Sequence, residues 1–100
     1  MNISVQELKQ RMNQGEQDFL LLDVREDAER AAGNIGGLHI PMGFVLARLG
    51  ELEDYQDQEV IVYCRSGGRS SMVQQLLLGR GFSNVKNLTG GMMAWEAMQP

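Results

Sequence analysis

Hydrophobic side chains are grouped along the chain in short continuous runs that alternate with stretches of helical spacing. Residues 19–24 and 60–63 are almost uninterrupted apolar runs, which are typical of strands buried on both faces of a parallel sheet. Residues 85–88 predict a third strand, and residues 38–40 predict a shorter fourth strand that Pro41 ends. The pattern therefore predicts four strands with helices between them.

The first helix has clear signals at both ends. Ser4 is a suitable N-cap, Glu7 completes a capping box, and Gly15 is placed to end the helix in the left-handed conformation. Further helices are predicted over residues 26–32, about 44–49, 70–78 and 92–98. In the helix over 70–78, the side chains expected to face inward are Met72, Val73, Leu76 and Leu77. Strands that alternate with helices predict an α/β fold with a parallel sheet.

Length and charge limit the class of protein. The chain has 100 residues, which is the usual size of one domain, and we assign a single domain to residues 1–100. A net charge of -4 with only nine scattered basic residues argues against a nucleic-acid partner, because phosphate binding needs clustered Lys and Arg. Uncharged apolar runs such as residues 19–22 are too short to span a bilayer. We expect a soluble cytoplasmic protein without a membrane partner.

Cys64 and His39 are the only cysteine and the only histidine in the sequence. One cysteine cannot form an intramolecular disulfide, and this pair alone cannot supply the ligands of a zinc site. We therefore predict no metal and no cofactor. A catalytic Cys–His pair is possible in principle, but His39 precedes Ile40 and Pro41 at a strand end, and we assign it a structural or surface position.

The chemistry is concentrated in residues 64–70, which read Cys-Arg-Ser-Gly-Gly-Arg-Ser and follow a buried strand directly. Loops at the carboxyl edge of an α/β sheet can direct successive backbone N–H groups into one concave space at a helix N-terminus. Those dipoles, with the charges of Arg65 and Arg69, are expected to lower the pKa of Cys64 and favour the nucleophilic thiolate. Gly67 and Gly68 allow the backbone to curl around one sulfur atom.

A lone cysteine at a strand end is more often a small core residue than a nucleophile. The flanking residues favour the nucleophile, because a core cysteine needs neither two nearby arginines nor two glycines between them.

Three motifs, in order along the chain, resemble one family. Residues 64–70 match the active-site loop Cys-Arg-Ser-Gly-x-Arg-Ser of rhodanese-type sulfurtransferases at every position. Residues 22–25, Leu-Asp-Val-Arg, with Glu29 and Gly33 are similar to the family's Asp-x-Arg, Glu and Gly signature. Gly90-Gly91 with Ala94-Trp95 resembles its C-terminal Gly-Gly-x-x-x-Trp signature. The resemblance covers essentially the whole chain.

This resemblance implies a three-layer fold, in which helices flank a five-stranded, mainly parallel sheet, and a two-step reaction. Cys64 would attack the outer sulfur of thiosulfate or a persulfide donor, and the resulting persulfide would pass its terminal sulfur to a thiol, cyanide or a sulfur-carrier protein. Arg69, with Arg65, would hold an anionic donor. Backbone N–H groups from Arg65 through Ser66, Gly67 and Gly68 to Arg69 would stabilise thiolate and persulfide.

Supporting residues are expected around this loop. Asp23 and Arg25 are expected to form an ion pair near the carboxyl end of the first long strand, and Ser70 to support the loop. Trp95 is assigned to the core. Residues 33–41, Gly-Asn-Ile-Gly-Gly-Leu-His-Ile-Pro, are one residue shorter than in many members and lack a family histidine. This form resembles rhodanese domains fused to enzymes that activate ubiquitin-like sulfur carriers, so the donor and acceptor stay open.

Two other classes of function compete with sulfur transfer. A noncatalytic rhodanese-like binding module can lose its cysteine freely, whereas this chain has Cys64 with Arg65 and Arg69. A small cysteine phosphatase or arsenate reductase is the other alternative. Phosphatases use a Cys-x5-Arg loop, but here the second arginine comes after four residues and Ser70 occupies the phosphatase position.

Overall fold

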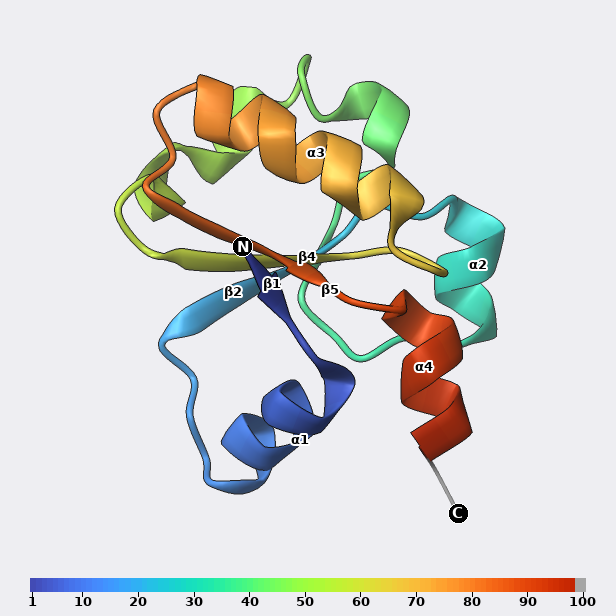
Figure 1. The fold of residues 1–100 in the computed structure, drawn as a ribbon. Helices are drawn as coiled ribbons and strands as arrows, with labels where there is room; N and C mark the ends of the chain where they lie inside the picture. The colour runs from blue at the N-terminus through green and yellow to red at the C-terminus, as the bar shows by residue number, and fades with distance from the viewer. Residues whose placement is uncertain (99–100) are drawn as a thin grey trace.

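The computed structural model describes residues 1–98 and shows an α/β fold built on a five-stranded sheet (Figure 1). The strands lie in the order β1-β5-β4-β2-β3, and every neighbouring pair is parallel. Their bounds are β1 Asn2–Ile3, β2 Phe19–Asp23, β3 Leu38–His39, β4 Glu59–Tyr63 and β5 Asn84–Leu88. The predicted fold class is confirmed. The last two residues of the predicted domain, residues 99–100, lie outside the described ones.

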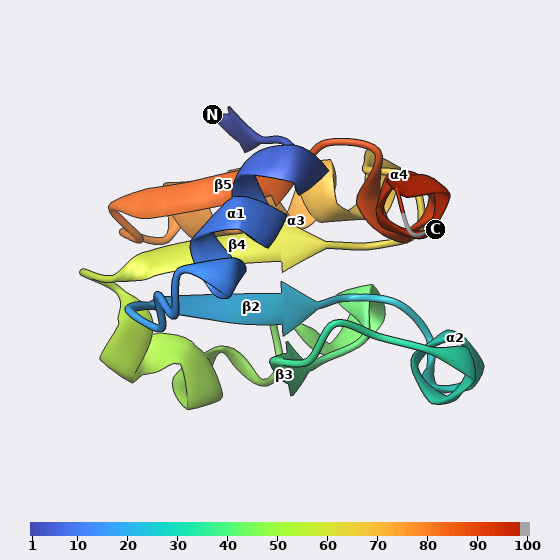
Figure 2. The same cartoon turned by 90° about the horizontal axis from the view of Figure 1, so that it is seen from below.

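Helices cover both faces of the sheet, which gives the three predicted layers (Figures 1 and 2). The helix α3 (Gly68–Gly79) lies on one face, with two 3₁₀ helices at Met42–Phe44 and Leu49–Tyr55. The opposite face is covered by α1 (Val5–Asn13) and α4 (Gly91–Met98). The short α2 (Asp27–Ala32) lies beyond the carboxyl ends of the strands. None of the helices in residues 1–98 is long and apolar enough to cross a membrane.

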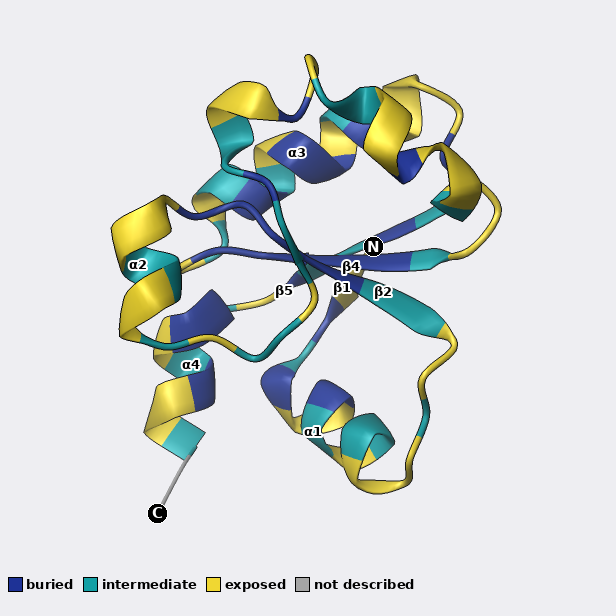
Figure 3. Ribbon diagram, turned by 180° about the vertical axis from the view of Figure 1, so that it is seen from behind, coloured by how far each residue is buried: buried dark blue, intermediate teal, exposed yellow. Residues whose placement is uncertain are grey.

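The central strand β4 explains why the apolar runs are continuous. Val60 and Val62 pack on the α3 side of the sheet, whereas Ile61 and Tyr63 pack on the side of α1 and α4. Both faces are therefore buried, as Figure 3 shows for the middle of the sheet. Cys64 continues this alternation and joins the cluster on the α3 side.

Capping signals predicted α1 correctly. The Ser4 side chain accepts a hydrogen bond from the backbone N–H of Glu7, and the Glu7 carboxylate accepts one from the backbone of Ser4. Gly15 has φ +81, in the left-handed region where glycine is favoured. The strand β1 directly before this helix was absent from the prediction, because two residues show no measurable alternation.

The predicted helix over residues 44–49 is wrong. The segment between β3 and β4 instead forms turns and the two 3₁₀ helices. It has to cross the α3 side of the sheet, and it does so by burying Val45 and Leu52 while Phe44 and Leu46 stay exposed.

The inward face of α3 also differs from the prediction. Met72 is 66% exposed, and Leu76 is only partly buried. The buried residues of this helix are Ser70, Val73, Gln74 and Leu77. Gln74 can be buried because its amide donates a hydrogen bond of 2.9 Å to the Val85 carbonyl. The hydrophobic pattern predicts that Gln74, as a polar residue, points outward. It therefore assigns Met72 to the buried face of the helix in place of Gln74.

Candidate functional site

The candidate site lies where β4 ends and α3 begins. Cys64 follows the last residue of β4, and the chain turns through residues 65–67 into α3. The neighbouring strands β2 and β3 end at the same edge, and α2 lies beside it (Figure 1). This is the edge at which ligands bind in open parallel sheets.

The start of α4 holds the loop from behind. The backbone N–H groups of Met92 and Met93 donate hydrogen bonds of 2.9 Å each to the carbonyls of Cys64 and Arg65. Gly91 lies against the same carbonyls so closely that a Cβ atom there would be 2.4 Å from the Cys64 oxygen. Because the loop carbonyls are engaged on this side, its N–H groups are free to turn toward the sulfur. The Gly90-Gly91 motif therefore supports the cysteine loop directly.

Several hydrogen-bond donors surround the Cys64 sulfur. The backbone N–H of Gly67 lies 3.1 Å from Sγ and that of Ser70 lies 3.4 Å away, while the Ser70 hydroxyl is at 3.3 Å. Gly67 has φ +110, which only glycine adopts readily, whereas Gly68 has no positive φ and begins the helix. Of the two predicted glycines, only Gly67 is required by the curl of the backbone.

Burial and hydrogen bonding act in opposite directions on the Cys64 pKa. Cys64 is 1% exposed, and this burial raises its pKa because it disfavours the charged thiolate. Hydrogen bonds from the Ser70 side chain and from the backbone N–H groups of Ser70, Gly67 and Ser66 outweigh that effect, so the pKa lies below its ordinary value. The direction agrees with the sequence prediction, but hydrogen bonds rather than arginine charges dominate the lowering.

We expect the alkylation rate of Cys64 to rise with pH and level off below the free-thiol pKa of about 8.5. The reason is that the thiolate is the reactive form, and its fraction grows as pH rises through the lowered pKa. Iodoacetamide alkylation followed by mass spectrometry at a series of pH values measures the midpoint. Ser70→Ala removes one donor to Sγ and should raise that midpoint. A midpoint at or above 8.5 in the unmodified chain would contradict the hydrogen-bonded cradle.

Asn87 is a site residue that the sequence prediction missed. It lies in β5 opposite Val62 of β4, and its side chain reaches the loop. The Ser70 hydroxyl lies within hydrogen-bond distance of both Asn87 Oδ1 and the Cys64 sulfur, and its one proton can be given to either. Asn87 Nδ2 donates a 3.3 Å hydrogen bond to the Gly67 carbonyl. A polar residue one position from the end of a predicted strand was the signal available for it.

The two arginines of the loop have different surroundings. Arg69 forms a two-pronged ion pair with Glu29 of α2, with distances of 2.7 Å from Nη1 and 2.8 Å from Nη2. Arg65 is exposed and is unpaired among the residues that the structure describes. Binding of an anionic donor by Arg69 stays a prediction, and any such donor shares Arg69 with Glu29.

The residues of the Asp-x-Arg signature connect the sheet to α2. Asp23 and Arg25 form the predicted ion pair, in which Nε and Nη2 of Arg25 each lie 2.9 Å from an Asp23 oxygen. Arg25 also donates to the carbonyl of Glu29 within α2 and to that of Gly33, which caps the end of α2. Burial raises the pKa of Asp23, but the hydrogen bonds from Arg25 hold it below its ordinary value. The pair therefore anchors the helix that presents Glu29 to Arg69.

His39 and Trp95 occupy the structural positions predicted for them. His39 is partly buried and its Nε2 lies 2.7 Å from the Arg25 carbonyl oxygen, so the ring supports the turn after β2. Trp95 is buried in the cluster beneath α1 and α4.

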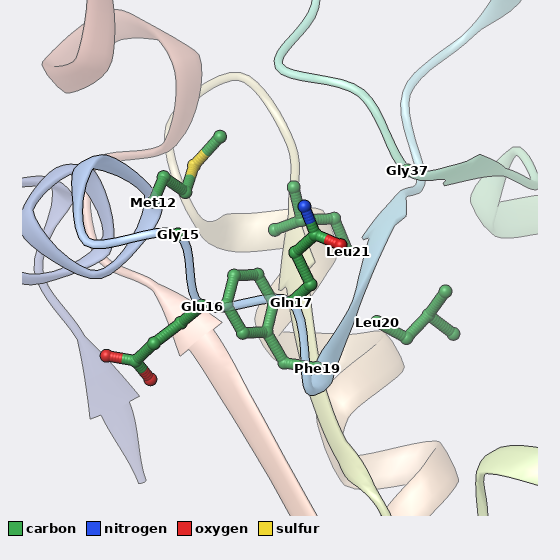
Figure 4. A pocket seen from close by; sticks show the side chains of 8 residues that line it. All are labelled: Met12, Gly15, Glu16, Gln17, Phe19, Leu20, Leu21 and Gly37. Carbon is green, nitrogen blue, oxygen red and sulfur yellow. The ribbon is translucent and has the colours of Figure 1, made fainter.

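A surface hollow of about 330 Å³ lies away from the cysteine loop (Figure 4). Its lining comes from the end of α1, the following turn, β2 and Gly37. The Gln17 side chain stands beside Phe19 and Leu21, and Glu16 points away toward its ion-pair partner Arg11. None of the predicted site residues lines this hollow.

Comparison with known proteins identifies the family. The rhodanese-like domain model matches residues 4–98, and the chain belongs to this family. A protein named sulfurtransferase from Allochromatium vinosum is 40% identical over 94 residues, which cover 93% of this chain and 85% of the relative. The putative sulfurtransferase YtwF of Bacillus subtilis is 42% identical over 95 residues, with 94% and 88% covered. The solution structure of an Anabaena rhodanese-like domain has a TM-score of 0.87 and 30% identity, covering 97% of this chain and 74% of that one.

Proposed function

We propose that this chain is a sulfurtransferase that carries a sulfane sulfur as a persulfide on Cys64. The observation that carries the proposal is the set of hydrogen-bond donors from Gly67 and Ser70 around the Cys64 sulfur. The relatives named sulfurtransferase support sulfur transfer as the class of activity.

The first half-reaction loads the sulfur. The Cys64 thiolate attacks the outer sulfur of the donor, forming a sulfur–sulfur bond on the protein and breaking the donor's own bond to that sulfur. With thiosulfate the leaving group is sulfite. Thiosulfate carries two negative charges and the thiolate carries one, and the products, sulfite and the persulfide anion, carry the same three charges. No proton transfer is needed, so no acid–base residue is required. We expect the N–H groups that stabilise the thiolate to stabilise the persulfide as well.

The second half-reaction unloads the sulfur. A thiol, cyanide or a sulfur-carrier protein attacks the terminal sulfur of the persulfide and leaves Cys64 as the thiolate again. The two half-reactions require two partners: a small-molecule sulfur donor, and an acceptor that is a thiol, cyanide or a sulfur-carrier protein. A cytoplasmic location and a single domain over residues 1–100 stay predictions.

Intact mass spectrometry after incubation with thiosulfate tests the proposal directly. The expected result is a mass increase of one sulfur atom that cyanide removes as thiocyanate. Peptide mapping should place the added sulfur on Cys64. A chain that gains no sulfur from thiosulfate, from polysulfide or from cysteine persulfide would contradict the proposal.

Arg69→Ala is expected to raise the KM for thiosulfate by about tenfold or more. Loss of a hydrogen bond to a charged group costs about 1.5–3 kcal/mol, and the predicted role of Arg69 is to hold the anionic part of the donor. A persulfide loaded by another route should still pass its sulfur to a small thiol. Single-turnover kinetics of each half-reaction measures the two effects separately.

Arg80→Ala is the matched control, because Arg80 caps the far end of α3 and its loss removes the same charge. It should leave the thiosulfate KM within about twofold of the original, as expected for a distant exposed charge. An unchanged KM in Arg69→Ala would leave Arg65 or the backbone to hold the donor. Failure of both half-reactions would instead assign Arg69 to holding the loop.

The alternative functions have less support. A noncatalytic module needs no thiolate-stabilising loop, yet the Cys64 sulfur accepts several hydrogen bonds. The family match does not favour a phosphatase or an arsenate reductase.

A further inference from the structure

The charge of Arg69 is already partly neutralised in this structure. Its two terminal nitrogens face the two carboxylate oxygens of Glu29, and both side chains are 30% exposed. Arg69 is close enough to interact electrostatically with Cys64, so an incoming donor would meet this partly exposed ion pair. A doubly charged donor must therefore either displace Glu29 from Arg69 or approach a carboxylate.

Glu29 is held firmly in this place. The backbone N–H of Glu26 donates a 3.0 Å hydrogen bond to Glu29 Oε1, and Arg25 donates to the Glu29 carbonyl. The hydrogen bonds from Arg69 lower the Glu29 pKa to about 2, so the carboxylate stays charged throughout the neutral range. A fixed negative charge at this position is a permanent feature of the site.

A second carboxylate also acts on Arg69. Glu26, the residue directly before α2, interacts electrostatically with the Arg69 guanidinium, as Glu29 does. Two carboxylates thus oppose the charge of Arg69, and a dianion gains little net attraction from it. A donor with less negative charge beside its sulfane sulfur does not have to compete with Glu29 for Arg69.

From this arrangement the geometry points to Glu29 as a specificity-determining residue that disfavours dianionic sulfur donors such as thiosulfate and favours organic persulfides. The inference rests on the proposed function and names its donor class. With a persulfide R–S–SH, the Cys64 thiolate bonds to the terminal sulfur and the sulfur–sulfur bond of the donor breaks. The products are the Cys64 persulfide, which keeps the hydrogen, and the thiolate R–S⁻, so atoms and charge balance.

Glu29→Gln tests this inference, because it removes the charge while the amide oxygen can still accept one hydrogen bond from Arg69. Loading of Cys64 is measured in single turnovers with thiosulfate and, separately, with cysteine persulfide. The ratio of the two kcat/KM values should shift by about fivefold toward thiosulfate, as expected for one partly exposed charge. A ratio that does not change, or that shifts toward cysteine persulfide, would overturn the inference.

Glu26→Gln is the matched control, since it removes the same charge from the N-cap residue of α2 without breaking the contact with Arg69. It should shift the ratio less than Glu29→Gln, and an equal shift would assign the effect to general charge rather than to Glu29. If Glu29→Gln fails to fold, the unmodified chain still decides the matter. Faster loading from thiosulfate than from cysteine persulfide at equal concentrations overturns the donor preference, whereas no loading from either donor contradicts the proposed function itself.

Discussion

Cys64→Ser is expected to abolish thiocyanate formation from thiosulfate and cyanide while leaving the fold intact. A serine hydroxyl is not ionised at neutral pH and cannot carry the transferable sulfur as a persulfide. The fold should survive because the side chain becomes slightly smaller, and an oxygen can still accept the hydrogen bonds that Gly67 and Ser70 donate to Sγ. A colorimetric thiocyanate assay measures the loss, and a thermal unfolding curve checks the fold.

The control places the thiol elsewhere in the same chain. Ser83 is exposed at the start of β5, at the opposite edge of the sheet from the loop, and Ser83→Cys in the Cys64→Ser background restores one cysteine without the cradle. This double variant should stay inactive. Turnover in either variant above the uncatalysed rate would show that the persulfide does not depend on Cys64 in its loop.

The parts of the site that could be predicted from the sequence are those carried by contiguous residues. Residues 64–70 form one loop whose position follows from the buried strand before it and the helix after it. The ion pair of Asp23 and Arg25 is also local, because only one residue lies between its partners. Short-range features of this kind need no knowledge of how distant elements pack.

The parts that escaped prediction depend on contacts between distant elements. Glu29 was recognised only as part of a signature, because its pairing with Arg69 depends on how α2 is anchored beside α3. Asn87 reaches the loop only because β5 pairs with β4 in one register. The inward face of α3 was missed for a related reason, since Gln74 is buried through a hydrogen bond to Val85 of another strand.

Gly91→Ala is expected to lower the free energy of unfolding by about 3 kcal/mol, because it combines overpacking with backbone strain. Gly91 has φ +54, and a Cβ atom would lie 2.4 Å from the Cys64 oxygen and 2.8 Å from the Arg65 oxygen. These neighbours are backbone atoms of the loop, so relief of the clash must move either the loop or α4. Urea unfolding measures the loss of stability, and alkylation of Cys64 against pH measures the displacement of the cradle.

Gly68→Ala is the matched control, because Gly68 begins α3 as Gly91 begins α4. It has no positive φ, and a Cβ atom there would meet nothing within 4 Å. Alanine at such a position should leave stability unchanged or raise it slightly, since it restricts the unfolded chain. If Gly91→Ala behaves like this control, with the same stability and the same pH midpoint, the contact between the start of α4 and the loop carbonyls does not hold the cradle in place. If instead the stability falls and the Cys64 midpoint rises together, the Gly-Gly motif and the cysteine loop act as one structural unit, because the N–H groups reach Sγ only while Met92 and Met93 engage the carbonyls behind them.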